Sequence, residues 1–127
     1  SDNGNRNPKF LALATQDFNS LKLQSLQLIK GWVESNGDLH NKVIPLIESL
    51  SGQENMCIVF TDENFDSKQS AYYYLRAVEP PSPRWHRYDC ARLEPNQRPP
   101  VCTNNDYPNT IREMAWSSPI WYRGVGN

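Results

Sequence analysis

The chain has 127 residues, of which 38% are hydrophobic and 11% aromatic, with 13 basic and 14 acidic side chains. This length predicts one domain with its own apolar core. The net charge of -1 argues against a generally basic nucleic-acid binder, so no nucleic-acid partner is expected. No apolar run approaches the ~20 residues that cross a bilayer, which excludes membrane insertion. Residues 1–8 are polar and Asn-rich, and we expect a disordered linker there.

The residues that usually carry catalysis are few. The chain has only two histidines, His40 and His86, and they lie far apart in the sequence. We expect His40 on the surface of a hairpin strand and His86 exposed on a loop. Its three cysteines, Cys57, Cys90 and Cys102, lack the C-x-x-C spacing of zinc sites. Motifs of phosphate-binding loops, zinc proteases and serine hydrolases are absent. We therefore predict that this chain alone is not an enzyme and holds no metal or other cofactor.

Short apolar, β-branched and aromatic runs separated by turn residues predict an all-β fold. The expected strands are residues 9–15, 21–34, 38–47, 56–61, 71–78 and 115–122. In the second run Leu26, Leu28 and Trp32 share one side, and Lys30 interrupts that apolar series. Asn36-Gly37 predicts a hairpin with a type I′ turn, because both residues accept positive φ. Pro45 and Pro119 place their strands at sheet edges.

In the 71–78 strand, Ala71, Tyr73 and Leu75 share one face, and Tyr72 and Tyr74 share the other. This strand follows a polar loop that contains Asp66. Ala71-x-Tyr73 after such a loop resembles the corner before strand F of immunoglobulin-like domains, where a tyrosine hydroxyl holds the loop. We predict an immunoglobulin-like antiparallel β-sandwich over residues 9–123. A long Pro-rich loop, residues 79–110, interrupts it before the last strand, and residues 124–127 are expected to form a frayed tail.

The Pro-rich loop also concentrates arginine and aromatic side chains. The candidate binding or interface residues there are Arg84, Trp85, His86, Arg87, Tyr88 and Arg92. Arginine beside aromatic rings can bind phosphate or anchor a protein interface. One alternative is purely structural: the aromatic side chains cap the sandwich, while Arg76 and Arg87 pair with Glu79 and Asp89. In a second alternative, these residues dock against another domain of the same chain. In a third, they contact a ligand directly.

Two cysteines, Cys90 and Cys102, bracket part of this loop. A disulfide between them would stabilise the fold by about 2–3 kcal/mol. It would also imply an oxidising compartment, periplasmic or extracellular. Cys57 lies on a strand that looks buried, and we expect it to be a small core residue.

Near the end of the chain, Trp116 and Trp121 allow two interpretations. They could form an aromatic platform that binds sugar, or they could pack on the sandwich face as alternate residues of an edge strand.

Several blocks, taken in order, identify a family resemblance over nearly the whole chain. They are Leu26-Gln27-Leu28-Ile29-Lys30-Gly31-Trp32, Asn36 to Val43, Ala71-Tyr72-Tyr73-Tyr74-Leu75-Arg76, Pro81-Ser82-Pro83-Arg84-Trp85 with Tyr88-Asp89, and Ile111 to Tyr122. Together they resemble the C-terminal part of the bacterial family called domain of unknown function 3604. That family is grouped with the PHP (polymerase and histidinol phosphatase) superfamily of metal-dependent phosphoesterases.

The resemblance implies an upstream catalytic domain of the same chain, holding divalent metal, in a protein that is often exported. The metal-binding motifs of such a domain are not in this sequence, so no catalytic residue is carried over. Cys90 and Cys102 are not part of the family pattern. We thus expect a non-catalytic C-terminal accessory domain that packs on the catalytic domain of a larger hydrolase. The alternative is an independent carbohydrate- or ligand-binding module.

Overall fold

A computed structural model describes residues 7–104 and 106–125. These residues form two units: a sandwich unit, which takes in the described residues up to Glu79 and from Met114, and a disulfide unit, Pro80–Glu113. Most of the expected linker at 1–8, and the last two residues of the expected tail, lie outside the described residues. Among the residues described, no helix is long and apolar enough to cross a membrane.

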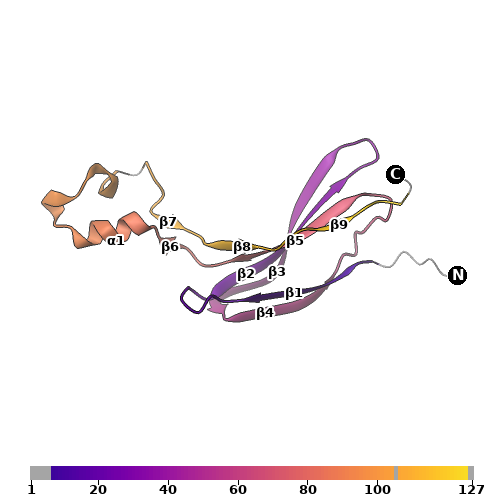
Figure 1. Cartoon of the computed structure of the whole chain (residues 1–127), viewed down its shortest axis with the longest axis horizontal. Coiled ribbons are helices and arrows are strands. Elements are labelled where there is room, and N and C mark those ends of the chain that lie inside the picture. Colours follow the sequence, from indigo (N-terminus) through magenta and orange to yellow (C-terminus); the bar gives the residue numbers. More distant parts are fainter. Residues whose placement is uncertain (1–6, 105, 126–127) are drawn as a thin grey trace. The chain divides into compact units, whose positions relative to one another are not determined.

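The sandwich unit is built of antiparallel strands, which confirms the all-β sandwich class (Figure 1). Its smaller sheet pairs β1 (Lys9–Thr15) with β4 (Asn55–Thr61). Its larger sheet has the order β3 (Leu39–Gln53), β2 (Leu23–Val33), β5 (Ala71–Val78) and β8 (Met114–Trp116), and β9 (Ile120–Tyr122) also pairs with β5.

The last expected strand is therefore two short strands on one edge of β5, separated at residues 117–119, where Pro119 cannot donate a ladder hydrogen bond. Pro45 lies on β3, the opposite edge of the larger sheet, as its missing N–H predicts.

The core lies between the inner faces of the two sheets. Ala12 and Met56 of the smaller sheet are fully buried against Leu26 of β2. Side chains alternate along a strand, so the neighbour of Met56, Cys57, faces outward. Cys57 is an exposed free thiol. The expectation of a core cysteine is therefore wrong, because Met56 occupies the inward position beside it.

The interruption at Lys30 has a structural explanation. Lys30 points inward with Leu26 and Leu28, is only 7% exposed, and forms an ion pair with the carboxylate of Asp62. The hydroxyl of Tyr73 donates a hydrogen bond to the same carboxylate at 2.8 Å. Burial raises the pKa of Tyr73, and the hydrogen bond to Asp62 and its negative charge raise it further. These contacts connect the loop after β4 to the larger sheet.

The hairpin at Asn36-Gly37 forms, but with a different turn. Of Asn36 and Gly37, only Gly37 has positive φ, +89°. The N–H of Gly37 donates to the carbonyl of Glu34 at 2.9 Å. Glu34 also donates its N–H to Asp38, which leaves three residues in the loop. This is a tight turn followed by a glycine in the left-handed region, and it needs only one residue of positive φ where a type I′ turn needs two.

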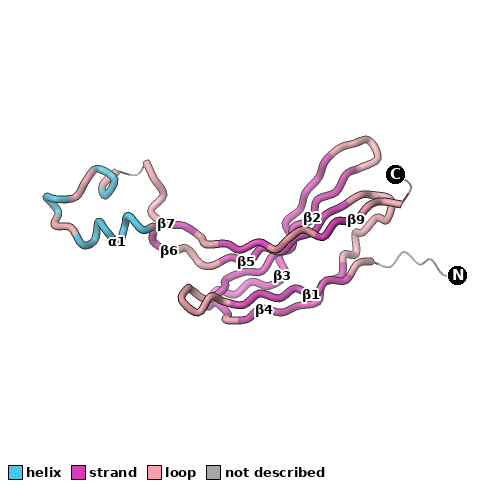
Figure 2. Tube along the Cα trace, viewed as in Figure 1, coloured by secondary structure: helices cyan, strands magenta, loops and turns pink. Residues whose placement is uncertain are grey.

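The Pro-rich segment contains regular structure, which the sequence did not predict. The disulfide unit contains β6 (Ser82–Pro83), α1 (Trp85–Arg92), two 3-10 turns, η1 (Pro95–Gln97) and η2 (Pro100–Cys102), and β7 (Thr110–Ile111). Figure 2 shows that the helical elements belong to this unit. Strands β6 and β7 pair antiparallel at its two ends, so the segment closes on itself.

The start of the expected tail is held in place. The N–H of Gly124 donates to Ser70 Oγ at 3.1 Å, and the N–H of Val125 donates to the carbonyl of Ser67 at 2.8 Å. Tyr122 also donates its hydroxyl hydrogen to that Ser67 carbonyl, at 3.0 Å. The chain is thus attached through Val125 to the loop that precedes β5.

Candidate functional site

The first two residues of α1 have opposite environments. Trp85 is 75% exposed, whereas His86 is buried within the disulfide unit. His86 was expected on an open loop, and this expectation is wrong because the segment is helical. Cys90, one helical turn later on the same face, is also buried. A hollow of about 630 Å³ lies beside these side chains, and its lining includes Arg84, Trp85, His86, Cys90, Val101 and Tyr107.

Two residues that line this hollow each carry an unpaired polar atom. Nε of Arg84 and Nε2 of His86 are buried and have no hydrogen-bond partner among the described residues. A buried polar atom without a partner costs about 1–3 kcal/mol relative to one that is paired. Native proteins therefore leave few such atoms, and each one suggests a missing partner. The hollow thus lies beside an exposed tryptophan, and two of its lining residues carry unpaired polar atoms beneath the surface.

The other candidates of this segment lie on the surface. Arg87 donates from Nη1 to the carbonyl of Cys102 at 3.3 Å, so it connects α1 to η2. Tyr88 is 55% exposed, and Arg92 is an exposed residue of the last helical turn. A cation at that position interacts favourably with the carbonyl end of the helix.

The ion pairs of the structural alternative are not formed among the described residues. Arg76 donates from Nε to Oε1 of Gln27 at 2.8 Å. The carboxylate of Glu79 instead accepts a hydrogen bond from the hydroxyl of Ser20 at 2.7 Å. The side chains that the sequence suggested as partners of Glu79 therefore have other contacts.

A disulfide joins Cys90 of α1 to Cys102 of η2, with 5.6 Å between their Cα atoms. It connects the helix to the second 3-10 turn across the Pro-rich connection. Both cysteines also line the hollow, so the covalent bond holds two of its walls together. Trp85 is therefore presented by a cross-linked element rather than by an open loop.

Trp116 and Trp121 lie on the larger sheet of the sandwich unit, on separate strands. They are 60% and 74% exposed, so they do not pack into the core. Tyr72 and Tyr74 of β5 lie beside them, and the four rings with Ser117 and Pro119 line a shallow groove of about 300 Å³. The two tyrosines are the members of this cluster that the sequence interpretation missed. The alternation of 71–78 placed both on one face, but it did not show which strand lies beside them.

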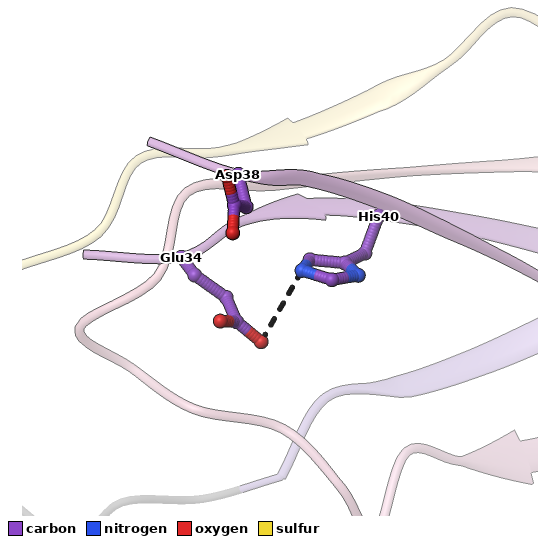
Figure 3. Close-up of side chains that lie close together, drawn as sticks. All are labelled: Glu34, Asp38 and His40. Atoms are coloured by element: carbon purple, nitrogen blue, oxygen red, sulfur yellow. Dashed lines mark ion pairs between the residues drawn. The ribbon is translucent and has the colours of Figure 1, made fainter. Parts of the chain in front are cut away.

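One cluster could hold a metal ion. Glu34, Asp38 and His40 lie at the β2–β3 hairpin, and their ligand atoms all lie within 4.8 Å of one another. Glu34 Oε1 lies 3.3 Å from His40 Nε2. Figure 3 shows this ion pair with Asp38 beside it. The imidazole of His40 stacks on Trp32, with 5.3 Å between ring centroids. His40 is a surface residue, as expected, but the sequence interpretation did not foresee these neighbours. The signal was the short hairpin, which returns residue 40 to residue 34.

The comparisons with known proteins identify one family. The model of the family described as "Protein of unknown function (DUF3604)" matches residues 1–49 and 45–124. No curated protein and no solved structure matches the chain.

Proposed function

The chain belongs to the DUF3604 family, and from that premise we propose that it is a non-catalytic C-terminal accessory domain of a larger metal-dependent hydrolase. The catalytic domain would be of the PHP type, upstream in the same polypeptide, and would hold the divalent metal. The disulfide unit packs on that domain, with Trp85 as the central contact. The polypeptide works in the periplasm or outside the cell.

The observation that carries this proposal is the hollow beside Trp85. Exposed tryptophans next to a concave surface are typical anchors of protein interfaces. Docking would cover the exposed ring of Trp85 and remove its apolar surface from water. The disulfide supports the localisation, because such bonds persist in oxidising compartments.

The arrangement also supports docking over binding of a free small molecule. Trp85 projects from the unit and is 75% exposed, which leaves most of its surface available to a partner. A rigid, cross-linked element loses little conformational entropy when it docks. The same rigidity makes the unit suitable for fixing the position of a neighbouring domain.

The test is association between this chain and the separately produced upstream region, measured by isothermal titration calorimetry. We expect a 1:1 complex that Trp85→Ala weakens at least tenfold, equivalent to about 1.4 kcal/mol. Trp121→Ala is the matched control, because it removes an equally exposed tryptophan of the sandwich unit. Phosphoesterase assays with divalent metal should find activity in the upstream region and none in this chain.

Two results would contradict the proposal. One is the absence of a complex, or a complex that Trp85→Ala and Trp121→Ala weaken equally. The other is metal-dependent hydrolysis by the 127-residue chain itself.

A further inference from the structure

The outer face of the larger sheet carries an ordered group of aromatic rings. Tyr72 and Tyr74 are two positions apart on the same face of β5, with their ring centroids 6.3 Å apart and their planes only 10° from parallel. Trp121 of β9 contacts Tyr72, with 5.4 Å between centroids. Trp116 of β8 completes the groove beside Tyr74. We call these four residues the aromatic face.

The backbone under the aromatic face keeps Tyr72 in position. Gly31 lies opposite Tyr72 in the β2–β5 register. A Cβ atom placed on Gly31 would come within 2.2 Å of the Tyr72 ring, so the ring lies directly over the bare glycine. The Tyr72 ring therefore occupies space that the side chain of any residue other than glycine at position 31 would fill. A ring held in this way does not have to be ordered when a ligand arrives, which lowers the cost of binding.

From this arrangement we propose that the aromatic face binds a polysaccharide chain of neutral pyranose sugars. The face of a pyranose ring presents C–H groups and its rim presents hydroxyls. A ligand of this kind needs flat aromatic surfaces together with nearby hydrogen-bonding groups. Tyrosine and tryptophan supply both, because each has a large apolar ring and one polar group.

The side chains around the rings fit that requirement. Apart from the four rings, the groove is lined by Ser117 and Pro119, with no Leu, Ile, Val or Met among its lining residues. Arg76 follows Tyr74 at the next position on the same face of β5, and opposite it in the register is Trp116. Its guanidinium has five N–H donors, of which Nε–H goes to Gln27. Polar contacts for sugar hydroxyls are thus available at one end of the groove.

The length of the surface indicates a chain rather than a single sugar. A second hollow of about 290 Å³ has Tyr72 and Trp121 among its lining residues, and both of them also line the groove. It continues past Val33, Leu39 and His40 at the β2–β3 hairpin. Two adjoining depressions that share aromatic walls offer successive positions to a linear ligand.

Charge and location favour this ligand over others. A single-stranded nucleic acid also stacks on aromatic rings, but it needs a basic groove, and the chain has a net charge of -1. The disulfide supports the proposed periplasmic or extracellular location, where polysaccharides are accessible long-chain ligands. This inference uses other residues than the proposed docking of the disulfide unit, so either can fail while the other stands.

Affinity electrophoresis of the 127-residue chain tests the proposal. Native gels would contain hydroxyethylcellulose, xylan, glucomannan or laminarin, and we expect retardation by at least one of them. Trp116→Ala and Trp121→Ala should each lower the association constant at least tenfold. Trp85→Ala, which removes an exposed tryptophan of the disulfide unit, should leave it unchanged. Circular dichroism identifies variants that have not folded, and Tyr74→Phe, which keeps the ring, should retain most of the binding.

Three outcomes would overturn the proposal. The first is the absence of retardation by all four polysaccharides. The second is retardation that Trp116→Ala and Trp121→Ala leave intact. The third is binding of a decaproline peptide in their place, lost in the same variants, because that would make the aromatic face a site for Pro-rich segments.

Discussion

Lys30 and Asp62 form an ion pair inside the sandwich, where the exposed fractions of the two residues are 7% and 2%. The ammonium group of Lys30 also donates to the carbonyl of Asn64 at 3.0 Å, and Oδ1 of Asp62 accepts from the N–H of Asn64 at 3.1 Å. Each charge therefore has further hydrogen bonds. A buried ion pair persists only when it is satisfied in this way, because taking both charges from water is costly.

Breaking this pair from one side should destabilise the sandwich strongly. Lys30→Met leaves the Asp62 carboxylate buried without its cation, and we expect a loss of about 3–5 kcal/mol in the free energy of unfolding. Urea denaturation followed by circular dichroism measures it. Lys22→Met is the matched control, because the Lys22–Glu54 pair is exposed and should contribute less than about 1 kcal/mol. Equal losses in the two variants would contradict the role given to the buried pair.

The raised pKa of Tyr73 predicts a loss of stability in alkali. In the unfolded chain Tyr73 loses its proton near pH 10, whereas in the folded chain burial and Asp62 hold the proton to higher pH. Above pH 10 the unfolded state therefore binds fewer protons than the folded state, and the free energy of unfolding falls as pH rises. Below pH 10 Tyr73 keeps its proton in both states, so its contribution to the free energy of unfolding is fully present there.

Urea denaturation between pH 8 and 11 provides the measurement. Tyr73→Phe should be less stable at pH 8, by about 1 kcal/mol for the lost hydrogen bond, and should show a shallower decline above pH 10. Tyr88→Phe, at an exposed position, should follow the wild-type profile. A steep decline that Tyr73→Phe retains would show that another group is responsible.

The disulfide should keep the disulfide unit folded and protected from proteolysis. Replacing Cys90 and Cys102 together with serine removes a cross-link over 12 positions, which the chain-entropy model values at about 3 kcal/mol. Limited trypsin digestion should then cleave after Arg87 and Arg92 much faster than in the wild type. Cys57→Ser should cleave at the wild-type rate, because this thiol is free and exposed. Similar cleavage in all three proteins would contradict the prediction.

Gly31→Ala should disturb the aromatic face from beneath. The new methyl group overlaps the Tyr72 ring, so the ring must move, and we expect a loss of about 1–3 kcal/mol in the free energy of unfolding. The same substitution in a Tyr72→Ala background should have a much smaller effect, because the space above residue 31 is then open. A double-mutant cycle by urea denaturation measures this coupling. A coupling near zero would mean that the Tyr72 ring does not rest on Gly31.

The sequence alone predicted the main strands of the sandwich unit, because their signals are local, although β3 runs to Gln53, beyond its expected end at residue 47. Alternation of side chains placed Ala71, Tyr73 and Leu75 on one face, and the loop at Gly37 predicted the hairpin between β2 and β3. The prolines at 45 and 119 were expected at edges for the same reason, since a missing N–H acts on its own residue. The resemblance also identified the family correctly.

The helix α1 could not be predicted in the same way. Trp85–Arg92 has no amphipathic repeat, and neighbouring prolines favour extended structure. Its stability depends on η2 and on the disulfide, which bring together residues that lie apart in the chain. His86 was therefore expected to be exposed, although packing within the disulfide unit buries it.

Lys30 and the aromatic face also show what the sequence predicts and what only the tertiary structure decides. Periodicity located Lys30 as an interruption and placed Tyr72 and Tyr74 on one face. It could not identify Asp62 as the ion-pair partner, or Trp116 and Trp121 as neighbours of the tyrosines. Strand alternation is a property of one segment, whereas these contacts depend on which strands lie beside β5 and where the loop after β4 returns. Only the tertiary structure decides that order, because it results from burying all the apolar faces at once.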